Sequence, residues 1–519
     1  MSYQPAKPPL ISKRSLLAPF AALLLVTAGF NSTARADNLT DIYQLALVND
    51  PTLQAAEASY NANSEIKTQA LSQLLPQVTA SASYTESDQD SESLRYFSAD
   101  IPFASNFNTE NETESYSISL TQNVFNLQAF FAFKQSKALS KQAELQFAID
   151  QQSLIIRAAE AYFDVLRGRD NLISSLAEEK AIKQQLEQTQ QRYDVGLIAI
   201  TDVHEARAAF DLAVANRLTE EVNLGIAYEN LTALTGQQHT NLYNLSSEFV
   251  TSKPQPETPE AWVEFANQNN LSIKLAEQVA EASNQNAKVK KAAHAPTLQA
   301  VVSYKDSTTD TSQFSNSRSV SEVPIPATVL DTGGNPVTVN TTSSTSVNSG
   351  PGPIPDSFSN SDGTTLELRM QLPLFSGGLT SSERRQAGYE RVRDQANLVA
   401  AKRTAFRQAR SSYLTTVADT ARVNARSLAI TSAESALDAT QAGYDAGTRN
   451  IVDLLNAQRD LFRAQRDHAN TRYDYVINSL KLKEAAGILS PQDIEDLNKW
   501  LIPPAAVLKS ETPSATGNR

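Results

Sequence analysis

Two copies of one motif hold the residues whose types and spacing are most informative about chemistry. Each copy reads Tyr-Asp-x-Gly-x-x-x-Ile-x-Asp, first at Tyr193–Asp202 and again, 251 residues later, at Tyr444–Asp453. The second copy contains Arg449, and the first ends on Thr201 and Asp202. A guanidinium, carboxylates and a hydroxyl suit ion pairs and hydrogen bonds between two turns. The motifs therefore predict a contact site and not a reaction centre.

Residues for catalysis or metal binding follow no recognisable pattern elsewhere. The four histidines have no histidine partner three or four residues away, so we expect solvated side chains and no metal site; they are His204, His239, His294 and His468. The chain has no Gly-rich phosphate loop, nucleophile elbow or zinc motif. Its lack of cysteine excludes disulfides, thiolate metal sites and an N-terminal lipidated cysteine. We expect no enzyme, no cofactor and no metal.

Each motif predicts a tight turn between two helices. Gly196 and Gly447 accept a positive φ, which closes the incoming helix. Asn450 suits an N-cap, and Asp453 then lies in the first turn of the next helix, near the positive end of the helix dipole. The equivalent cap position in the first copy is Ala199, which predicts a weaker helix start.

The first 36 residues read as a secretory signal peptide. Lys13 and Arg14 precede an apolar run over 16–30, and a small-x-small cleavage site follows at 34–36. The remaining 483 residues carry a formal charge of −16, which argues against a nucleic-acid partner. No later segment offers the ~20 consecutive apolar residues of a membrane-spanning helix, so a membrane form of this chain is expected to be a barrel.

Four short segments alternate between apolar and polar residues, as in strands with one apolar face. They are Val78–Thr85, Tyr116–Phe125, Leu298–Tyr304 and Leu366–Leu372. Strands of about ten residues fit a tilted crossing of a bilayer. Four strands cannot close a barrel, and open edges in lipid leave backbone groups unpaired, so several chains must contribute to one barrel.

Runs without proline connect the strands to the turn motifs and predict long helices. The run over 126–194 would be on the order of 100 Å long as one helix. Residues 305–363 are rich in Ser, Thr, Gly, Pro and Asp, and we expect a long exposed loop there. The repeat spacing divides the chain into a signal peptide over 1–36, two repeats and a C-terminal part. The first repeat, 37–250, is expected to have a helix over 39–75, a hairpin over 77–125 and long helices over 126–236. The second repeat, 251–487, is expected to have a helix over 259–293, a hairpin over 297–375 and long helices over 378–487, and a C-terminal equatorial segment with a disordered tail follows over 488–519.

These features together resemble the TolC family of outer-membrane channel-tunnels, the outer membrane factors of efflux and type I secretion. The resemblance covers nearly all of the mature chain, and its most specific segments are Asn49–Pro51, Leu75–Gln77, Ala161–Phe163, Arg192–Asp202, Lys253–Pro256 and Ala442–Leu455. It implies a mixed α and β membrane protein. Three chains, with four strands each, would form a twelve-stranded outer-membrane β-barrel continued by a long α-helical periplasmic barrel of coiled-coil hairpins.

The resemblance also implies partners and a location. The chain would form a homotrimer in outer-membrane lipid, with its helices in the periplasm, and would work with a periplasmic adaptor and an inner-membrane transporter. Its function would be an exit duct for tripartite efflux pumps, type I protein secretion, or both. The main alternative from the residues alone is an elongated periplasmic coiled-coil tether of the envelope, which leaves four alternating strands unexplained.

In the family, contacts between the two turns hold the inner end of the tunnel closed. Carried over by motif, Tyr444 and Arg449 of the second turn would meet Thr201 and Asp202 of the first. Without the resemblance, the same charges are equally well described as solvated loop residues, whose contact would contribute about 0–1 kcal/mol.

The family also has two acidic residues, one helical turn apart, around the narrowest point. Here the first is Asp453, but the second position is Asn456. We therefore expect one acidic layer in place of two and weaker block by multivalent cations. The simpler interpretation of Asp453 is an ordinary charge at a helix start.

Overall fold

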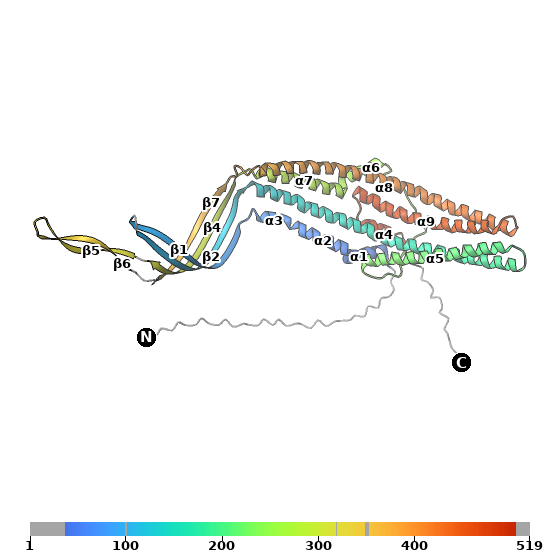
Figure 1. Ribbon diagram of the computed structural model, residues 1–519. Helices are drawn as coiled ribbons and strands as arrows, with labels where there is room; N and C mark the ends of the chain where they lie inside the picture. The colour runs from blue at the N-terminus through green and yellow to red at the C-terminus, as the bar shows by residue number, and fades with distance from the viewer. Residues whose placement is uncertain (1–36, 99–100, 318, 348–351, 505–519) are drawn as a thin grey trace, which may run out of the picture.

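The computed structural model describes residues 37–98, 101–317, 319–347 and 352–504. The chain is elongated, with a β-sheet at one end and paired helices that run from it to two turns at the other (Figure 1). The predicted signal peptide and the tail from residue 505 onward lie outside the described residues. None of the described helices has an apolar stretch long enough to cross a membrane.

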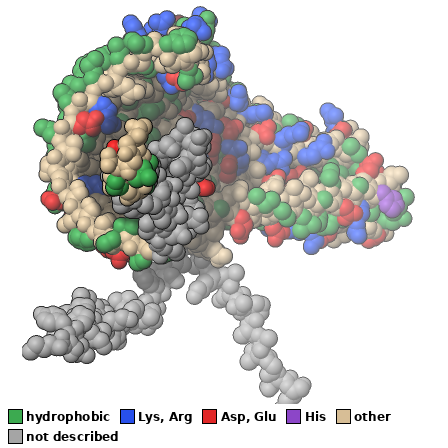
Figure 2. Space-filling view, turned by 60° about the vertical axis from the view of Figure 1, so that its left-hand side comes forward, with side chains coloured by type: hydrophobic (Ala, Val, Ile, Leu, Met, Phe, Trp, Pro, Cys, Tyr) green, Lys and Arg blue, Asp and Glu red, His purple; other side chains and the backbone are tan. Residues whose placement is uncertain are grey.

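The sheet is antiparallel and has the strand order β1-β2-β4-β7. Its strands are β1 Gln77–Ser98, β2 Ile101–Asn126, β4 Thr297–Ser317 and β7 Gly352–Gln371. The register pairs Val78 with Leu120, Leu120 with Val302, and Val302 with Leu366, so the apolar residues of all four strands share one face. Viewed toward this end of the molecule, hydrophobic side chains lie along the outer rim and charged ones within the hollow (Figure 2).

The prediction of a long loop over 305–363 is wrong, and so is the strand length of about ten residues. The four strands contain 22, 26, 21 and 20 residues. β4 continues to Ser317, and a hairpin of β5 Ser319–Leu330 and β6 Pro336–Val347 extends beyond the sheet (Figure 1). Ladder hydrogen bonds to neighbouring strands stabilise these Ser- and Thr-rich segments, so they need no apolar core of their own.

The helices of the first repeat are α1 Leu39–Asn49, α2 Pro51–Ser64, α3 Ile66–Ser72, α4 Leu127–Asp194 and α5 Ile200–Thr235. The expected single helix before the first strand is thus three helices. Asp50 makes the first break because its side chain accepts hydrogen bonds from the backbone N–H groups of Thr52 and Leu53 and caps α2. α4 contains 68 residues without interruption.

The second repeat has the same plan. Its helices are α6 Pro259–Asn269, α7 Leu271–Ala292, α8 Leu379–Asp445 and α9 Ile451–Ala486. A single helix over 259–293 is expected from the sequence, but Asn270 ends α6 and caps α7 through its side-chain oxygen. After α9 come α10 Pro491–Asn498 and β8 Leu501–Ile502, which pairs with β3 Asn244–Leu245 and so joins the C-terminal segment to the first repeat.

The largest apolar core lies where α1, α4, α5 and α9 meet, midway along the helices. Tyr162 and Phe163 of α4 are fully buried in it, and the Tyr162 hydroxyl donates to the Tyr243 carbonyl oxygen at 2.8 Å. Arg157 of α4 donates to buried Asp50 at 2.6 Å. This core anchors the long hairpins, and their far ends carry the turn motifs.

Candidate functional site

The two motifs form two tight turns at the same end of the molecule (Figure 1). Gly196 has φ 75° and Gly447 has φ 74°, a left-handed conformation that favours glycine. The N–H of Gly196 donates to the Tyr193 carbonyl oxygen at 2.8 Å, and that of Gly447 donates to the Tyr444 carbonyl oxygen at 3.1 Å. The two glycines therefore perform the same backbone role in both copies.

The second turn has additional side-chain hydrogen bonds. The backbone N–H of Asp453 donates to the Asn450 side-chain oxygen at 2.8 Å, and the Thr448 hydroxyl donates to the Gly443 carbonyl oxygen at 3.0 Å. A Cβ on Gly443 would lie 2.8 Å from Cγ of Arg449, so the absence of a side chain there allows the arginine to fold back against α8. The first turn starts its helix at Ala199, which makes no side-chain cap hydrogen bond.

A small apolar cluster behind the turns joins all four long helices. Its fully buried members are Ala206 of α5 and Ile451 and Leu454 of α9, and it also buries Ile182 of α4 and Tyr444 of α8. Burial of a large side chain stabilises a contact by about 1.5–3 kcal/mol, so this cluster fixes the second turn against the first. The turns are consequently held in a defined geometry within one chain.

The structure does not pair the predicted lock residues across the turns of one chain. Nη1 of Arg449 lies 3.6 Å from a carboxylate oxygen of Asp453, on its own helix. The Thr201 hydroxyl lies 3.3 Å from Oδ1 of Asp202, its neighbour in sequence. The Tyr444 ring is buried, and its hydroxyl has no hydrogen-bond partner among the described residues.

Arg192, near the end of α4, makes the cross-turn contact that the sequence reasoning missed. Its Cζ lies 4.9 Å from the centre of the Tyr444 ring, and its Nη1 lies 3.9 Å from Oδ1 of Asp445. A guanidinium over an aromatic face gains from the ring quadrupole. In the sequence, the one indication of this role was that Arg192 is the first residue of Arg192–Asp202, a segment that resembles the family.

Asp453 and Asn456 lie in the first two turns of α9 and are both partly exposed. Asn456 lines a cavity of about 330 Å³ between α4, α5 and α9, together with Glu178, Glu205 and Arg459. Its side-chain oxygen accepts a hydrogen bond from Nη2 of Arg459 at 2.8 Å. The position expected to be part of a neutral layer is therefore in contact with a positive charge.

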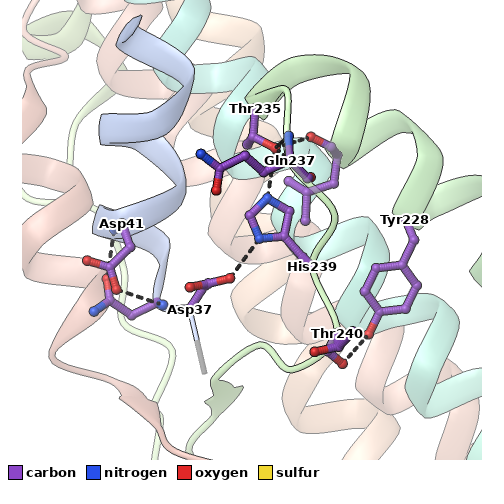
Figure 3. Close-up of polar contacts among 9 residues, drawn as sticks. Asp37, Asp41, Tyr228, Thr235, Gln237, His239 and Thr240 are labelled. Atoms are coloured by element: carbon purple, nitrogen blue, oxygen red, sulfur yellow. Dashed lines mark hydrogen bonds and ion pairs between the residues drawn. The ribbon is translucent and has the colours of Figure 1, made fainter. Parts of the chain in front are cut away.

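The prediction that all four histidines are solvated is wrong for His239. This residue is 7% exposed, and its Nδ1 lies 2.7 Å from Oδ2 of Asp37 while its Nε2 lies 2.7 Å from the Thr235 hydroxyl (Figure 3). The backbone of Asp37 also bridges to Leu242, so the start of the described chain is fixed beside α5. Among the described residues, no group of three or more side chains is suited to hold a metal ion.

Known proteins share this arrangement. The family model described as outer membrane efflux protein matches residues 42–237 and 336–488. The outer membrane protein TolC of Vibrio cholerae serotype O1 is 32% identical over 490 residues, which cover 94% of this chain and 99% of that protein. The alkaline protease secretion protein AprF of Pseudomonas aeruginosa is 24% identical, with 92% of this chain and 89% of that protein covered.

The fold has solved counterparts as well. The crystal structure of the outer membrane protein VceC from Vibrio cholerae superposes with a TM-score of 0.65 at 20% identity, over 86% of this chain and 96% of that chain. The mixed helix and strand architecture is thus shared with that outer membrane protein. The extent of the family match and the identity to TolC over nearly the whole chain show that this protein belongs to the outer membrane efflux protein family.

Proposed function

We propose that three copies of this chain form an outer-membrane exit duct, in which their sheets close one twelve-stranded barrel and their helices continue it into the periplasm. Membership of the family and the likeness to the secretion protein AprF support efflux and type I secretion as its uses. Substrates would enter at the turns and leave through the barrel.

The four-stranded sheet carries this proposal. Large apolar side chains are exposed on one face, including Val78 at 63%, Leu366 at 79% and Met370 at 67%. In water this apolar face would be unfavourably hydrated, whereas in a bilayer the lipid tails would cover it. Within one chain β1 and β7 each pair on one side only. Edges of this kind in lipid require further strands, and three sheets of four give a closed barrel.

The turns support a gate at the opposite end. Arg449 exposes 61% of its side chain, and its one ion pair among the described residues is with Asp453 on its own helix; Thr201 is exposed as well. We therefore place the lock contacts of Arg449 with Thr201 and Asp202 between neighbouring copies, where the second turn of one chain meets the first turn of the next. Tyr444 would support this lock from within its own chain, where it packs in the apolar cluster behind the turns.

The first turn offers a surface for the adaptor. Val195 and Leu197 expose 70% and 71% of their surface at the tip, where neither side chain contributes to a core cluster. Adjacent exposed apolar residues at a tip are suited to a partner protein. An adaptor that covers them would couple the inner-membrane transporter to the gate.

Native mass spectrometry in detergent tests the assembly. We expect a mass of three chains and extraction from the outer membrane only with detergent. A β1 edge variant, Ser81→Pro, provides the control, because proline cannot donate a ladder hydrogen bond and should weaken pairing. A monomer that still conducts ions in planar bilayers, or release of the chain by a salt wash, would contradict the proposal.

A further inference from the structure

The long helices carry opposite charge at their two ends. The helix segments next to the sheet contain eight lysines and arginines and one glutamate, a formal charge of +7; they are α3 and residues 127–137 of α4, 282–292 of α7 and 379–389 of α8. The helix segments next to the turn motifs contain three arginines and eight acids, a formal charge of −5; they are residues 184–194 of α4, 200–210 of α5, 435–445 of α8 and 451–461 of α9. The eight basic residues beside the sheet form a basic collar on a chain that is acidic as a whole.

Most charges of the basic collar are not balanced by acids of the same chain. Among the described residues, its one ion pair joins Nζ of Lys290 on α7 to Oε2 of Glu383 on α8, at 3.1 Å. Lys134 and Lys137 of α4 and Arg384 of α8 are exposed. A cluster of unbalanced positive charges attracts anions from outside the chain.

Aromatic rings lie beneath the two lysines of α4. Nζ of Lys134 lies 4.6 Å from the centre of the Phe130 ring, and Nζ of Lys137 lies 4.7 Å from that of Phe133. Spacings of three and four residues place all four side chains on one face of the helix. A lysine above an apolar ring is suited to the boundary between lipid tails and headgroups, because its stem stays in apolar surroundings while its charge stays in water.

The apolar face of the sheet continues as far as these lysines. Phe125, at the end of β2, pairs in register with Leu298 and exposes 47% of its surface. Leu374 and Phe375, between β7 and α8, are exposed as well. α4 begins two residues after Phe125, and Lys137 lies roughly 15 Å along it. With lipid tails on the apolar face of the sheet, the basic collar stands at the level of the lipid headgroups.

The location of most of the basic residues argues against a second copy of the chain as their counter-charge. α3 packs on α4, α4 on α7 and α7 on α8, so α4 and α7 lie between the other two helices (Figure 1). Five of the eight residues of the basic collar belong to α4 and α7. A neighbouring copy that pairs with β1 or β7 would instead approach α3 or α8, which adjoin these edge strands.

We propose that the basic collar binds the anionic headgroups of phospholipids, in the leaflet on the helical side of the sheet. This inference rests on the proposed function, because it requires the sheet to lie in a membrane. Phosphate oxygens accept charge-assisted hydrogen bonds from lysine and arginine, and an anionic leaflet attracts clustered basic residues beside it. Zwitterionic lipids carry no net charge and gain less from the collar. The acidic ends of the same helices would be repelled by an anionic leaflet, so the charge distribution fits one orientation of the chain.

Native mass spectrometry of the assembled protein in detergent, titrated with phosphatidylglycerol or phosphatidylethanolamine, tests this inference. For Lys134→Gln with Lys137→Gln, we expect the phosphatidylglycerol concentration at half-occupancy to rise roughly tenfold and phosphatidylethanolamine binding to stay unchanged. Lys134→Arg with Lys137→Arg should bind phosphatidylglycerol as the wild type does. The matched control is Lys180→Gln with Lys183→Gln, which removes two exposed lysines of the same spacing from α4, roughly 69 Å further from the sheet. It should leave the binding of both lipids unchanged.

The outcomes separate the inference from the function on which it rests. Unchanged phosphatidylglycerol binding in Lys134→Gln with Lys137→Gln, or an equal loss in the control pair, overturns the role of the basic collar. Equal loss of both lipids also overturns it, because the contact would then not depend on lipid charge. Dissociation of the Lys134→Gln, Lys137→Gln variant into single chains would show that the collar joins copies of the chain and does not bind lipid. A wild-type chain that a salt wash releases from the membrane overturns both the inference and the proposed function.

Discussion

The two turns of this protein have the same backbone and different chemistry. Gly196 and Gly447 agree in φ within one degree, and each follows a long helix that ends in Tyr-Asp. The first turn exposes Val195 and Leu197, whereas the second holds Thr448, Arg449 and Asn450 in hydrogen bonds and an ion pair. The two copies of the motif therefore share one backbone geometry but expose side chains of different chemistry.

This difference in side chains shows which residues a helix-to-helix turn requires and which positions can vary. A reversal between two helices needs one residue with a positive φ, and both copies supply glycine. The side chains beside it do not affect the reversal, so one turn is apolar and suited to a partner protein. The other is charged and suited to a gate. The predictions below test this division of roles.

The largest effect should come from disabling the polar turn. In Arg449→Ser with Tyr444→Phe, the second turn loses its guanidinium and a hydroxyl, and the closed end should open and raise single-channel conductance by more than about tenfold. The corresponding change in the apolar turn, Val195→Ser with Leu197→Ser, serves as the control and should leave conductance unchanged while it weakens adaptor binding. Wild-type conductance of the first double variant would place the lock elsewhere.

Asp453→Ala should have the next largest effect. If three copies of Asp453 surround the passage, their removal should raise the concentration of a multivalent cation needed for half block by about tenfold. Asp202→Ala, which removes a carboxylate from the equivalent position of the first turn, is the matched control and should change the block less. Unchanged block in Asp453→Ala would show that this residue is only a helix-start charge.

Local signals in the sequence predicted the helices and turns closely. The helix predicted over 126–194 is α4, Leu127–Asp194, in the structure. Its bounds were predictable because the signals that set them, the absence of helix breakers and the glycine after its C-terminus, act on residues nearby in the sequence. The mixed α and β architecture was also predictable, since the change to a period of two is visible in four segments. The strands beyond Thr85 were not, because they depend on pairing with segments up to about 200 residues away.

The parts of the site that escaped prediction depend on contacts between distant segments. His239 is buried because Asp37, 202 residues earlier, accepts its hydrogen bond. Arg192 contacts Tyr444 across the interface of two hairpins. The Arg459 contact to Asn456, by contrast, depends only on helical spacing, because residues three apart lie on the same surface of a helix. Lock contacts between copies of the chain stay a prediction.

The smallest expected effect comes from exchanging the helix caps, which differ between the two turns without any difference in net charge. Ala199 has φ −81° and ψ 155°, and Asn450 has φ −92° and ψ 169°, so asparagine fits at 199 without strain. Asn450→Ala removes the hydrogen bond to the Asp453 N–H and should cost about 1 kcal/mol, a roughly fivefold easier opening of the first turn of α9. Ala199→Asn should stabilise the start of α5 by a similar amount. Hydrogen exchange followed by mass spectrometry should show faster exchange near 451–454 in the first variant and slower exchange near 200–203 in the second. Equal exchange in both turns of the wild-type protein would show that packing of the four helices, and not the cap, sets the stability of the turns.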